Sequence, residues 1–135
     1  PIQLQNLRRK IGVQPRVNLD CQNAGELAYE DAAFDQVMVF FLLHELPAEV
    51  RAKALREVLR VVRPGGKVVF VDYHRPQRWH PHRYIMPLIL RTLEPFAMDL
   101  WYNEISHWLP DGVAPSKIEK TLYFGGLYQK LVMIR

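Results

Sequence analysis

Two short apolar runs flank a helical pattern near the middle of the chain. Residues 35–41 and 67–72 are rich in β-branched side chains and nearly continuous in apolar ones, as in strands buried on both faces. Between them, apolar and charged side chains recur on opposite faces at helical spacing. The apolar positions are Val50, Ala54, Leu55, Val58 and Val62, and the charged ones are Glu49, Arg51, Lys53, Arg56, Glu57 and Arg60. The pattern predicts a strand, a helix and a second strand parallel to the first.

Turn residues mark both ends of this predicted helix. Pro47 suits the first helical turn, where the amide that proline lacks would have no partner. Pro64-Gly65-Gly66 ends the helix, because proline lacks the donor and glycine accepts a positive φ. Turn chemistry explains these three residues fully, so they indicate a fold and no reaction.

The amino-terminal part adds a helix and a strand. Apolar residues at helical spacing predict a helix over residues 2–11. Residues 16–22 alternate between apolar and polar side chains, which predicts a short strand, and a loop follows over residues 23–34. We expect this strand to be parallel to the two central ones.

The carboxyl-terminal part combines helices with a hairpin. Residues 84–109 are apolar at helical spacing but contain Pro87 and Pro95, which predicts one kinked helix or two shorter ones. Residues 117–124 and 127–134 read as strands joined by a Gly-Gly turn, which predicts an antiparallel hairpin. The expected fold class is α/β, with a mostly parallel sheet and a carboxyl-terminal antiparallel hairpin.

Length, charge and composition limit the kinds of protein to which this sequence can belong. The 135 residues suit a single domain, and the formal charge of +4 favours anionic ligands or membrane surfaces. No nucleic-acid motif is visible, so no nucleic-acid partner is expected. The lone Cys21 excludes an internal disulfide, which is compatible with the cytoplasm. The apolar run over residues 84–90 is far shorter than the roughly 20 residues that span a bilayer.

Candidate chemistry gathers after the two central strands. Ligands of parallel sheets bind at the carboxyl ends of the strands, which directs attention to residues 40–45 and 72–74. His44 is a candidate catalytic base with Glu45 as the carboxylate that orients it, or both are surface residues that open the helix. Tyr73 and His74 follow the next strand; they are further candidate catalytic residues and are expected to face the same opening of the site as His44.

A basic, ring-rich segment follows these residues. His74, His80 and His82 lack further Cys or acidic ligands in a metal-binding pattern, so no metal site is expected. The segment also holds arginines that would meet anionic lipid headgroups or simply solvate a loop, and both alternatives stay open. These arginines are Arg75, Arg78 and Arg83.

Specific stretches resemble a known family. "NAGELAYEDAAFD" (23–35) and "ALREVLRVVRPGGKVVFVDY" (54–73) are similar to the ubiquinone and menaquinone C-methyltransferases, which are class I S-adenosylmethionine-dependent methyltransferases with a Rossmann-like sheet. "VDYHRP", "TLEPFA" and "FGGLYQK" look more like the rhodoquinone-biosynthesis relatives of that family. The resemblance implies S-adenosylmethionine as cofactor and methyl transfer, or amino transfer, to a quinone-like hydrophobic acceptor, with contact to a membrane face. It also implies that residues 74–110 form a helical insertion on the substrate side, with an aromatic-rich groove or ordinary core packing.

The resemblance also implies positions for cofactor contact. Asn23 and Ala24 match the pair that the family places at the adenine, where the asparagine oxygen can accept from the amino group. Phe40 matches the position that ends a strand against the cofactor. The family usually has serine there, so an apolar contact with the thioether or the acceptor ring is expected instead.

Two parts of the family's cofactor site have no counterpart in this sequence. They are the glycine-rich turn after the first strand and the acidic residue after the second. The chain begins at Pro1, so we expect a cut piece that lacks the first two strands of the domain and binds S-adenosylhomocysteine weakly or not at all. An exposed sheet edge favours association, so a homo-oligomer is expected. The alternative is that the chain is a non-catalytic fragment or remnant of a methyltransferase fold, which works only by association.

Overall fold

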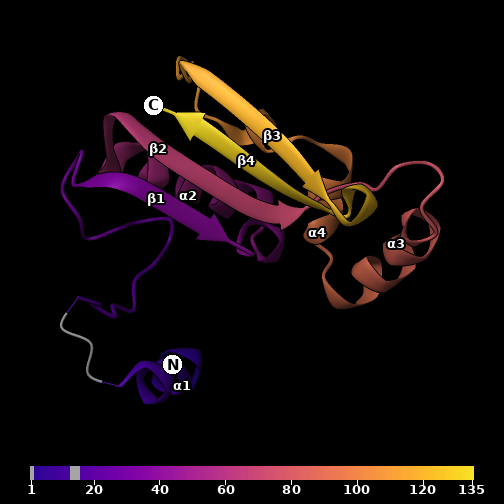
Figure 1. The fold of residues 1–135 in the computed structure, drawn as a ribbon, viewed down its shortest axis with the longest axis horizontal. Helices are drawn as coiled ribbons and strands as arrows, with labels where there is room; N and C mark the ends of the chain where they lie inside the picture. The colour runs from indigo at the N-terminus through magenta and orange to yellow at the C-terminus, as the bar shows by residue number, and fades with distance from the viewer. Residues whose placement is uncertain (1, 13–15) are drawn as a thin grey trace.

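The computed structural model describes residues 2–12 and 16–135. Within these residues, helices and strands alternate along the chain (Figure 1). In chain order they are α1 (Ile2–Ile11), β1 (Phe34–Phe40), the short helix η1 (Leu43–Glu45), α2 (Ala48–Val61), β2 (Val62–Tyr73), α3 (His82–Leu93), α4 (Ala97–Tyr102), the short helix η2 (Ile105–Trp108), β3 (Lys117–Tyr123), the short helix η3 (Phe124–Gly126) and β4 (Tyr128–Ile134).

The described strands form one mixed sheet in the order β1-β2-β4-β3. β1 and β2 are parallel and connected by α2, whereas β4 is antiparallel to both β2 and β3. The central strand-helix-strand unit and the terminal hairpin are therefore confirmed, and with them the α/β fold class. Figure 1 shows the arrows of β1, β2 and β3 pointing the same way and β4 the opposite way.

The turn after α2 depends on its two glycines. Gly65 has a φ of +74°, a left-handed conformation that side chains disfavour. A Cβ on Gly66 would lie 2.8 Å from the carbonyl oxygens of Arg63 and Asp35, so the strands approach too closely there for any side chain. α2 itself ends at Val61, and β2 starts earlier than the predicted residue 67.

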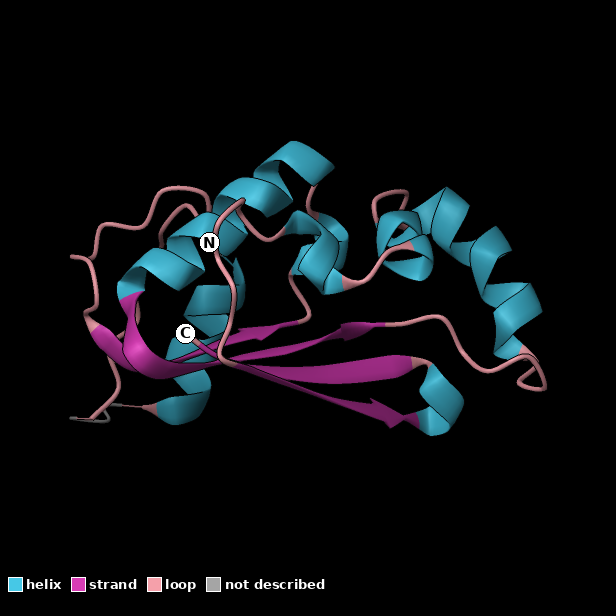
Figure 2. Cartoon of the chain, turned by 90° about the horizontal axis from the view of Figure 1, so that it is seen from above, coloured by secondary structure: helices cyan, strands magenta, loops and turns pink. Residues whose placement is uncertain are grey.

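Helices cover one face of this sheet. Alternate residues of β2 and β4 are buried, among them Val68, Phe70, Leu131 and Met133, which pack with apolar residues of α2 and α4. In Figure 2, α2 and α4 lie on the same side of the sheet, and α3 extends past the end of its strands. Met38 on β1 is 62% exposed on the opposite, open face.

The predicted strand at residues 16–22 was wrong. These residues have no hydrogen-bonded strand neighbour, and most of their side chains are exposed. An alternating pattern alone does not form a strand, because the backbone groups need a pairing partner.

The region of residues 84–109 forms two helices rather than one kinked helix. α3 contains Pro87 and ends at Leu93, and α4 starts at Ala97, so Pro95 lies in the break between them. Proline cannot donate the helical hydrogen bond, which explains the interruption. No helix among the described residues is long and apolar enough to cross a membrane.

Candidate functional site

The carboxyl ends of β1 and β2 lie side by side. Phe40 pairs with Val71, and the amide of Phe41 donates to the carbonyl oxygen of Val71 at 2.8 Å. η1, with His44, follows β1 directly, and Tyr73 ends β2. The parallel pairing thus brings two of the predicted catalytic residues together, as expected of this edge of a parallel sheet.

His44 is bound to a buried carboxylate. Its Nδ1 lies 2.8 Å from Oδ1 of Asp72, and both side chains are almost completely buried. Asp72 also accepts from the amides of Leu43 and Tyr73, at 2.9 and 2.8 Å. The sequence had suggested Glu45 as the orienting carboxylate, whereas the structure gives that role to Asp72. A lone acidic residue in the apolar run 67–72 was the signal for it.

The imidazole of His44 has a perturbed pKa. Burial lowers this pKa, but the hydrogen bond to Asp72 and the charges of Asp72, Glu94 and Glu45 outweigh burial and raise it above its usual value. With Nδ1 bound to Asp72, Nε2 is the atom left for chemistry. It lies 3.8 Å from Oε2 of Glu94, which is beyond hydrogen-bond distance.

A buried arginine fixes the turn that carries His44. Arg51, on α2, is fully buried and its guanidinium lies 4.4 Å from the ring centre of Trp108. Its hydrogen-bond partners are the carbonyl oxygens of Leu43, Leu46 and Phe96 and a carboxylate oxygen of Asp99, at 2.8 to 3.2 Å. The guanidinium therefore joins η1 to the start of α4.

Aromatic rings surround the histidine. The ring centre of Phe41 lies 6.1 Å from that of His44, 5.9 Å from Tyr73 and 5.4 Å from Tyr128. His44 and Tyr73 are 4.7 Å apart. Burial is the largest cause that raises the pKa of the Tyr73 hydroxyl, so Tyr73 stays neutral and can donate a hydrogen bond.

Phe41 has an unusual backbone. Its φ is +48°, a left-handed conformation that is uncommon for a bulky side chain and that occurs often at functional sites. Phe41 lies within the range 40–45 at the predicted strand end, but it was not singled out as a site residue. The aromatic pair Phe40-Phe41 at the end of the strand was the available signal, but a positive φ at a non-glycine residue has no sequence signature.

An open cavity of about 590 Å³ borders Phe41. Its lining includes Ala24, Phe40, Phe41 and Glu45, together with apolar residues of β1 and α2. Two of the three predicted cofactor residues, Ala24 and Phe40, thus border one cavity. Asn23 is not among the described residues that line it, and its Oδ1 accepts from the amide of Gly25 at 3.0 Å.

An ion pair on α2 holds the loop that carries Ala24. Glu57 accepts from the amide of Leu27 at 2.8 Å, and Arg60 donates to the carbonyl oxygens of Leu27 and Tyr29. The hydrogen bonds from Arg60 and from the Leu27 amide lower the pKa of Glu57 to about 2. The loop is thereby fixed against α2 at the border of the cavity.

His74 lies in a different environment. Its Nδ1 contacts the carbonyl oxygen of Gly126 at 2.9 Å, and it borders a separate cavity of about 230 Å³ with Arg75, Tyr102 and Glu104. Burial is the largest cause that lowers its pKa. The expectation that Tyr73 and His74 face the same opening was wrong, because successive residues at a strand end point to opposite faces.

The remaining histidines of the basic segment lie close together. The rings of His80 and His82 are 5.0 Å apart. No group of three or more His, Cys, Asp or Glu side chains that could hold a metal ion occurs within residues 2–12 and 16–135.

Comparisons with known proteins agree on one family. The family model described as "Methyltransferase domain" matches residues 1–70. The demethylmenaquinone methyltransferase of Bacillus mycoides is 40% identical over 106 residues, which cover 73% of this chain and 41% of that protein. The same enzyme of Oceanobacillus iheyensis is 32% identical over 121 residues, covering 82% of this chain and 48% of that protein. The chain thus spans less than half the length of these relatives.

Solved structures share the fold at low identity. A putative O-methyltransferase of Nostoc punctiforme aligns with 99% of this chain and 40% of its own, with a TM-score of 0.69 and 19% identity. An O-methyltransferase family protein of Burkholderia thailandensis aligns with 97% of this chain and 39% of its own, with a TM-score of 0.70 and 18% identity. Because the family model matches residues 1–70 of 135, the chain belongs to the methyltransferase domain family.

Proposed function

We propose that the chain is part of an S-adenosylmethionine-dependent methyltransferase that acts on a hydrophobic, quinone-like acceptor. One observation carries the proposal: the His44–Asp72 pair lies at the carboxyl ends of β1 and β2, beside aromatic rings and next to an apolar cavity. The demethylmenaquinone methyltransferases that match the chain support the same acceptor class.

The cavity fits one side of the cofactor. Its volume lies within the usual range for small-molecule sites, roughly 300 to 1,000 Å³. Ala24 would lie against the adenine and Phe40 would supply an apolar wall near the thioether. Oδ1 of Asn23 already accepts a hydrogen bond from the amide of Gly25. Asn23 would therefore contact the adenine only through the remaining hydrogen-bonding capacity of its side-chain amide. When bound, S-adenosylmethionine supplies an electrophilic methyl group.

His44 would act as the base. Methylation of a ring carbon forms a carbon–carbon bond, breaks the bond between sulfur and methyl, and requires loss of a proton from the acceptor. Nε2 of His44 would accept this proton while Asp72 holds Nδ1 and stabilises the imidazolium. The hydroxyl of Tyr73 would donate a hydrogen bond to an acceptor oxygen. Because the pKa of His44 is raised, transfer should become faster as the pH rises through that pKa.

We further propose that residues 74–110 form the acceptor side of the site. α3 and α4 contribute Leu90, Ala97 and Trp101 to an apolar cluster that also packs against Tyr73 and Tyr128. An acceptor ring placed beside Tyr73 would therefore also lie against the apolar side chains of this cluster. Aromatic side chains at the edge of an apolar cluster suit a quinone headgroup that carries an apolar tail.

A labelled-cofactor assay tests the proposal. S-Adenosylmethionine carrying different isotopes in its methyl and amino groups is incubated with the protein and a prenylated hydroquinone, and the product is analysed by mass spectrometry. We expect the methyl label in the product and a loss of about 100-fold in kcat for His44→Gln. His74→Gln should retain kcat within about twofold, since its side chain lies in the other cavity.

Two results would contradict this function. Transfer of the amino label would replace methyl transfer by the amino transfer that the resemblance of residues 71–76 leaves open. Equal kcat values for His44→Gln and the unaltered protein would remove His44 from the chemistry.

A further inference from the structure

The outer face of α3 exposes apolar side chains. We define the α3 stripe as Tyr84, Ile85, Leu88, Ile89 and Leu93, which recur at spacings of one, three and four residues on one side of the helix. Leu88 is 75% exposed and Leu93 is 72% exposed. Leu90 is the one residue of this helix that is completely buried among the described residues. The helix thus presents its apolar side to the exterior.

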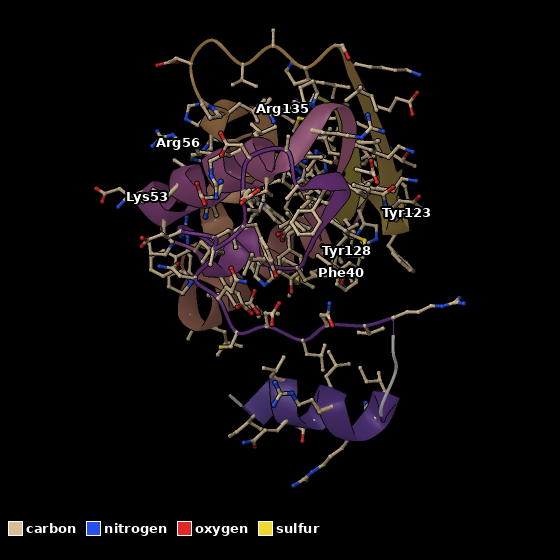
Figure 3. The ribbon with its side chains drawn as sticks, turned by 90° about the vertical axis from the view of Figure 1, so that its left-hand side faces the viewer. Phe40, Lys53, Arg56, Tyr123, Tyr128 and Arg135 are labelled. Carbon is tan, nitrogen blue, oxygen red and sulfur yellow. The ribbon has the colours of Figure 1, made fainter. Side chains whose placement is uncertain are left out.

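α2 shows the opposite arrangement in the same molecule. Its apolar residues, including Leu55 and Leu59, are buried in the core, and its exposed positions carry charges such as Lys53 and Arg56 (Figure 3). An exposed apolar face on a helix of this length needs a partner, because isolated apolar patches of that extent are uncommon on soluble surfaces.

The charge around the stripe identifies the kind of partner. Residues 74–93 contain four arginines and three histidines and no acidic residue. The arginines are Arg75, Arg78, Arg83 and Arg91. Within the part of the chain that the structure describes, no ion pair joins any of them to a carboxylate. An apolar stripe bordered by unneutralised arginines matches the chemistry of a bilayer with anionic lipids.

Two exposed aromatic side chains lie at one end of the α3 stripe. Trp79 is 72% exposed and Tyr84 is 69% exposed, and both lie at the amino-terminal end of α3. The hydroxyl of Tyr84 donates to the carbonyl oxygen of Arg78, which ties these aromatic and basic residues into one group. Tryptophan and tyrosine favour the boundary between headgroups and acyl chains.

We propose that the α3 stripe docks the protein onto an anionic membrane surface. The helix would lie in the interface, with the stripe among the acyl chains and the arginines at the phosphates. In Figure 1, α3 projects at one end of the molecule, past the carboxyl end of β2, so a flat surface can reach it. The inner side of α3 reaches the cluster around Tyr73, so an acceptor from the bilayer would arrive at the site. That last step rests on the proposed function, whereas docking does not.

Vesicle binding tests the docking directly. The chain is mixed with vesicles of phosphatidylcholine alone or with about one quarter phosphatidylglycerol, and the bound fraction is measured by flotation. We expect binding to the anionic vesicles and much weaker binding to the neutral ones. Lipids brominated near the headgroup should quench the fluorescence of Trp79, and Trp79→Phe should remove this quenching, since Trp101 is buried and Trp108 packs against the core under Arg51.

Matched variants assign the binding to this face. The double variant Arg78→Gln/Arg91→Gln should weaken partitioning about fivefold per arginine, whereas Lys53→Gln/Arg56→Gln on the outer face of α2 should change it less than twofold. Leu88→Asp/Leu93→Asp should weaken partitioning at least tenfold. Its control is Ile118→Asp/Leu122→Asp, which places the same charges at exposed positions of β3. Circular dichroism shows that each variant is folded.

Several outcomes would overturn the proposal. These are an absence of vesicle binding, equal losses in the α3 variants and their controls, or binding that does not depend on anionic lipid. A second copy of the chain is the competing occupant. If Leu88→Asp/Leu93→Asp turns a dimer into a monomer by light scattering and leaves vesicle binding unchanged, the stripe is a self-association surface instead.

Discussion

His44 and His74 follow neighbouring strands, but the partners of their Nδ1 atoms and the directions of their pKa shifts differ. His44 is held by the buried carboxylate of Asp72, and its turn is fixed by the buried guanidinium of Arg51. His74 is held by a backbone carbonyl, and the nearest carboxylate oxygen is that of Glu104, 3.8 Å from Nε2 and on an exposed side chain. The pKa is raised at His44 and lowered at His74.

The two surroundings show why one histidine at the strand ends is suited to act as a base and the other is not. A neutral imidazole at neutral pH is common, but a base also needs an acceptor that fixes the opposite nitrogen and stabilises the charged form. Only the His44 side supplies such a charged acceptor in a buried position. Substitutions of the residues around each histidine can therefore be compared in pairs.

The largest difference is expected between the two arginines. Arg51→Ala removes the donors to three carbonyl oxygens around η1 and α4, so it should lower the free energy of unfolding by about 4 kcal/mol. Arg75→Ala removes an exposed guanidinium 5.5 Å from the ring of Tyr102 and should cost less than about 1 kcal/mol. Urea denaturation measures both. If both substitutions lowered the free energy of unfolding equally, η1 would not depend on the hydrogen bonds from Arg51.

A smaller difference is expected between the two carboxylates. Asp72→Ala leaves the amides of Leu43 and Tyr73 and the imidazole of His44 without their acceptor, and should cost about 3 kcal/mol. Glu104→Ala, on the His74 side, removes an exposed carboxylate and should cost less than about 1 kcal/mol. Urea denaturation measures the free energy of unfolding of both variants. A cost for Asp72→Ala as small as that for Glu104→Ala would argue against a buried dyad.

The pH dependence of stability should have opposite signs for the two histidines. Because the folded-state pKa of His44 is raised, its contribution is fully present below the unfolded pKa of about 6.5 and is lost as the pH rises through the folded value. His44→Gln should therefore cost more at about pH 5.5 than at about pH 8.5. The lowered pKa of His74 means that protonation opposes folding, so His74→Gln should be least harmful at low pH. Thermal unfolding across this pH range checks both signs, and a shared sign would contradict the comparison.

Much of the fold could be predicted from the sequence, because the relevant signals are local. Hydrophobic period and the Pro-Gly-Gly turn gave the strand-helix-strand unit, and the Gly-Gly turn gave the hairpin. The strand at residues 16–22 failed because a strand also needs a neighbour, which no local pattern can supply. Sequence resemblance identified the methyltransferase family, and the family model confirms it.

The site was predictable only in part. His44 and Tyr73 were selected by their place after parallel strands, and the structure brings their rings to 4.7 Å. Asp72 was overlooked as the partner because Glu45 is adjacent in sequence, whereas Asp72 is adjacent in space. His74 was included because its place after the strand was used and the alternation of side chains along a strand, by which successive residues point to opposite faces, was not. The expectation of a homo-oligomer stays a prediction, as does the placement of the adenine at Asn23.

Ligand mapping by nuclear magnetic resonance tests whether the cavity at Phe40 and the imidazole of His44 form one reacting site. The labelled chain is titrated with S-adenosylhomocysteine and then with dihydroxynaphthalene as an acceptor ring, both at millimolar concentration because binding is expected to be weak. We expect the first ligand to shift the amide resonances of Ala24 and Phe40, and the second to shift the side-chain resonances of His44 and Tyr73 and leave those of His74 unchanged. Shifts confined to His74, or to the cavity beside Lys67 and Lys117 on the open face of the sheet, would contradict it.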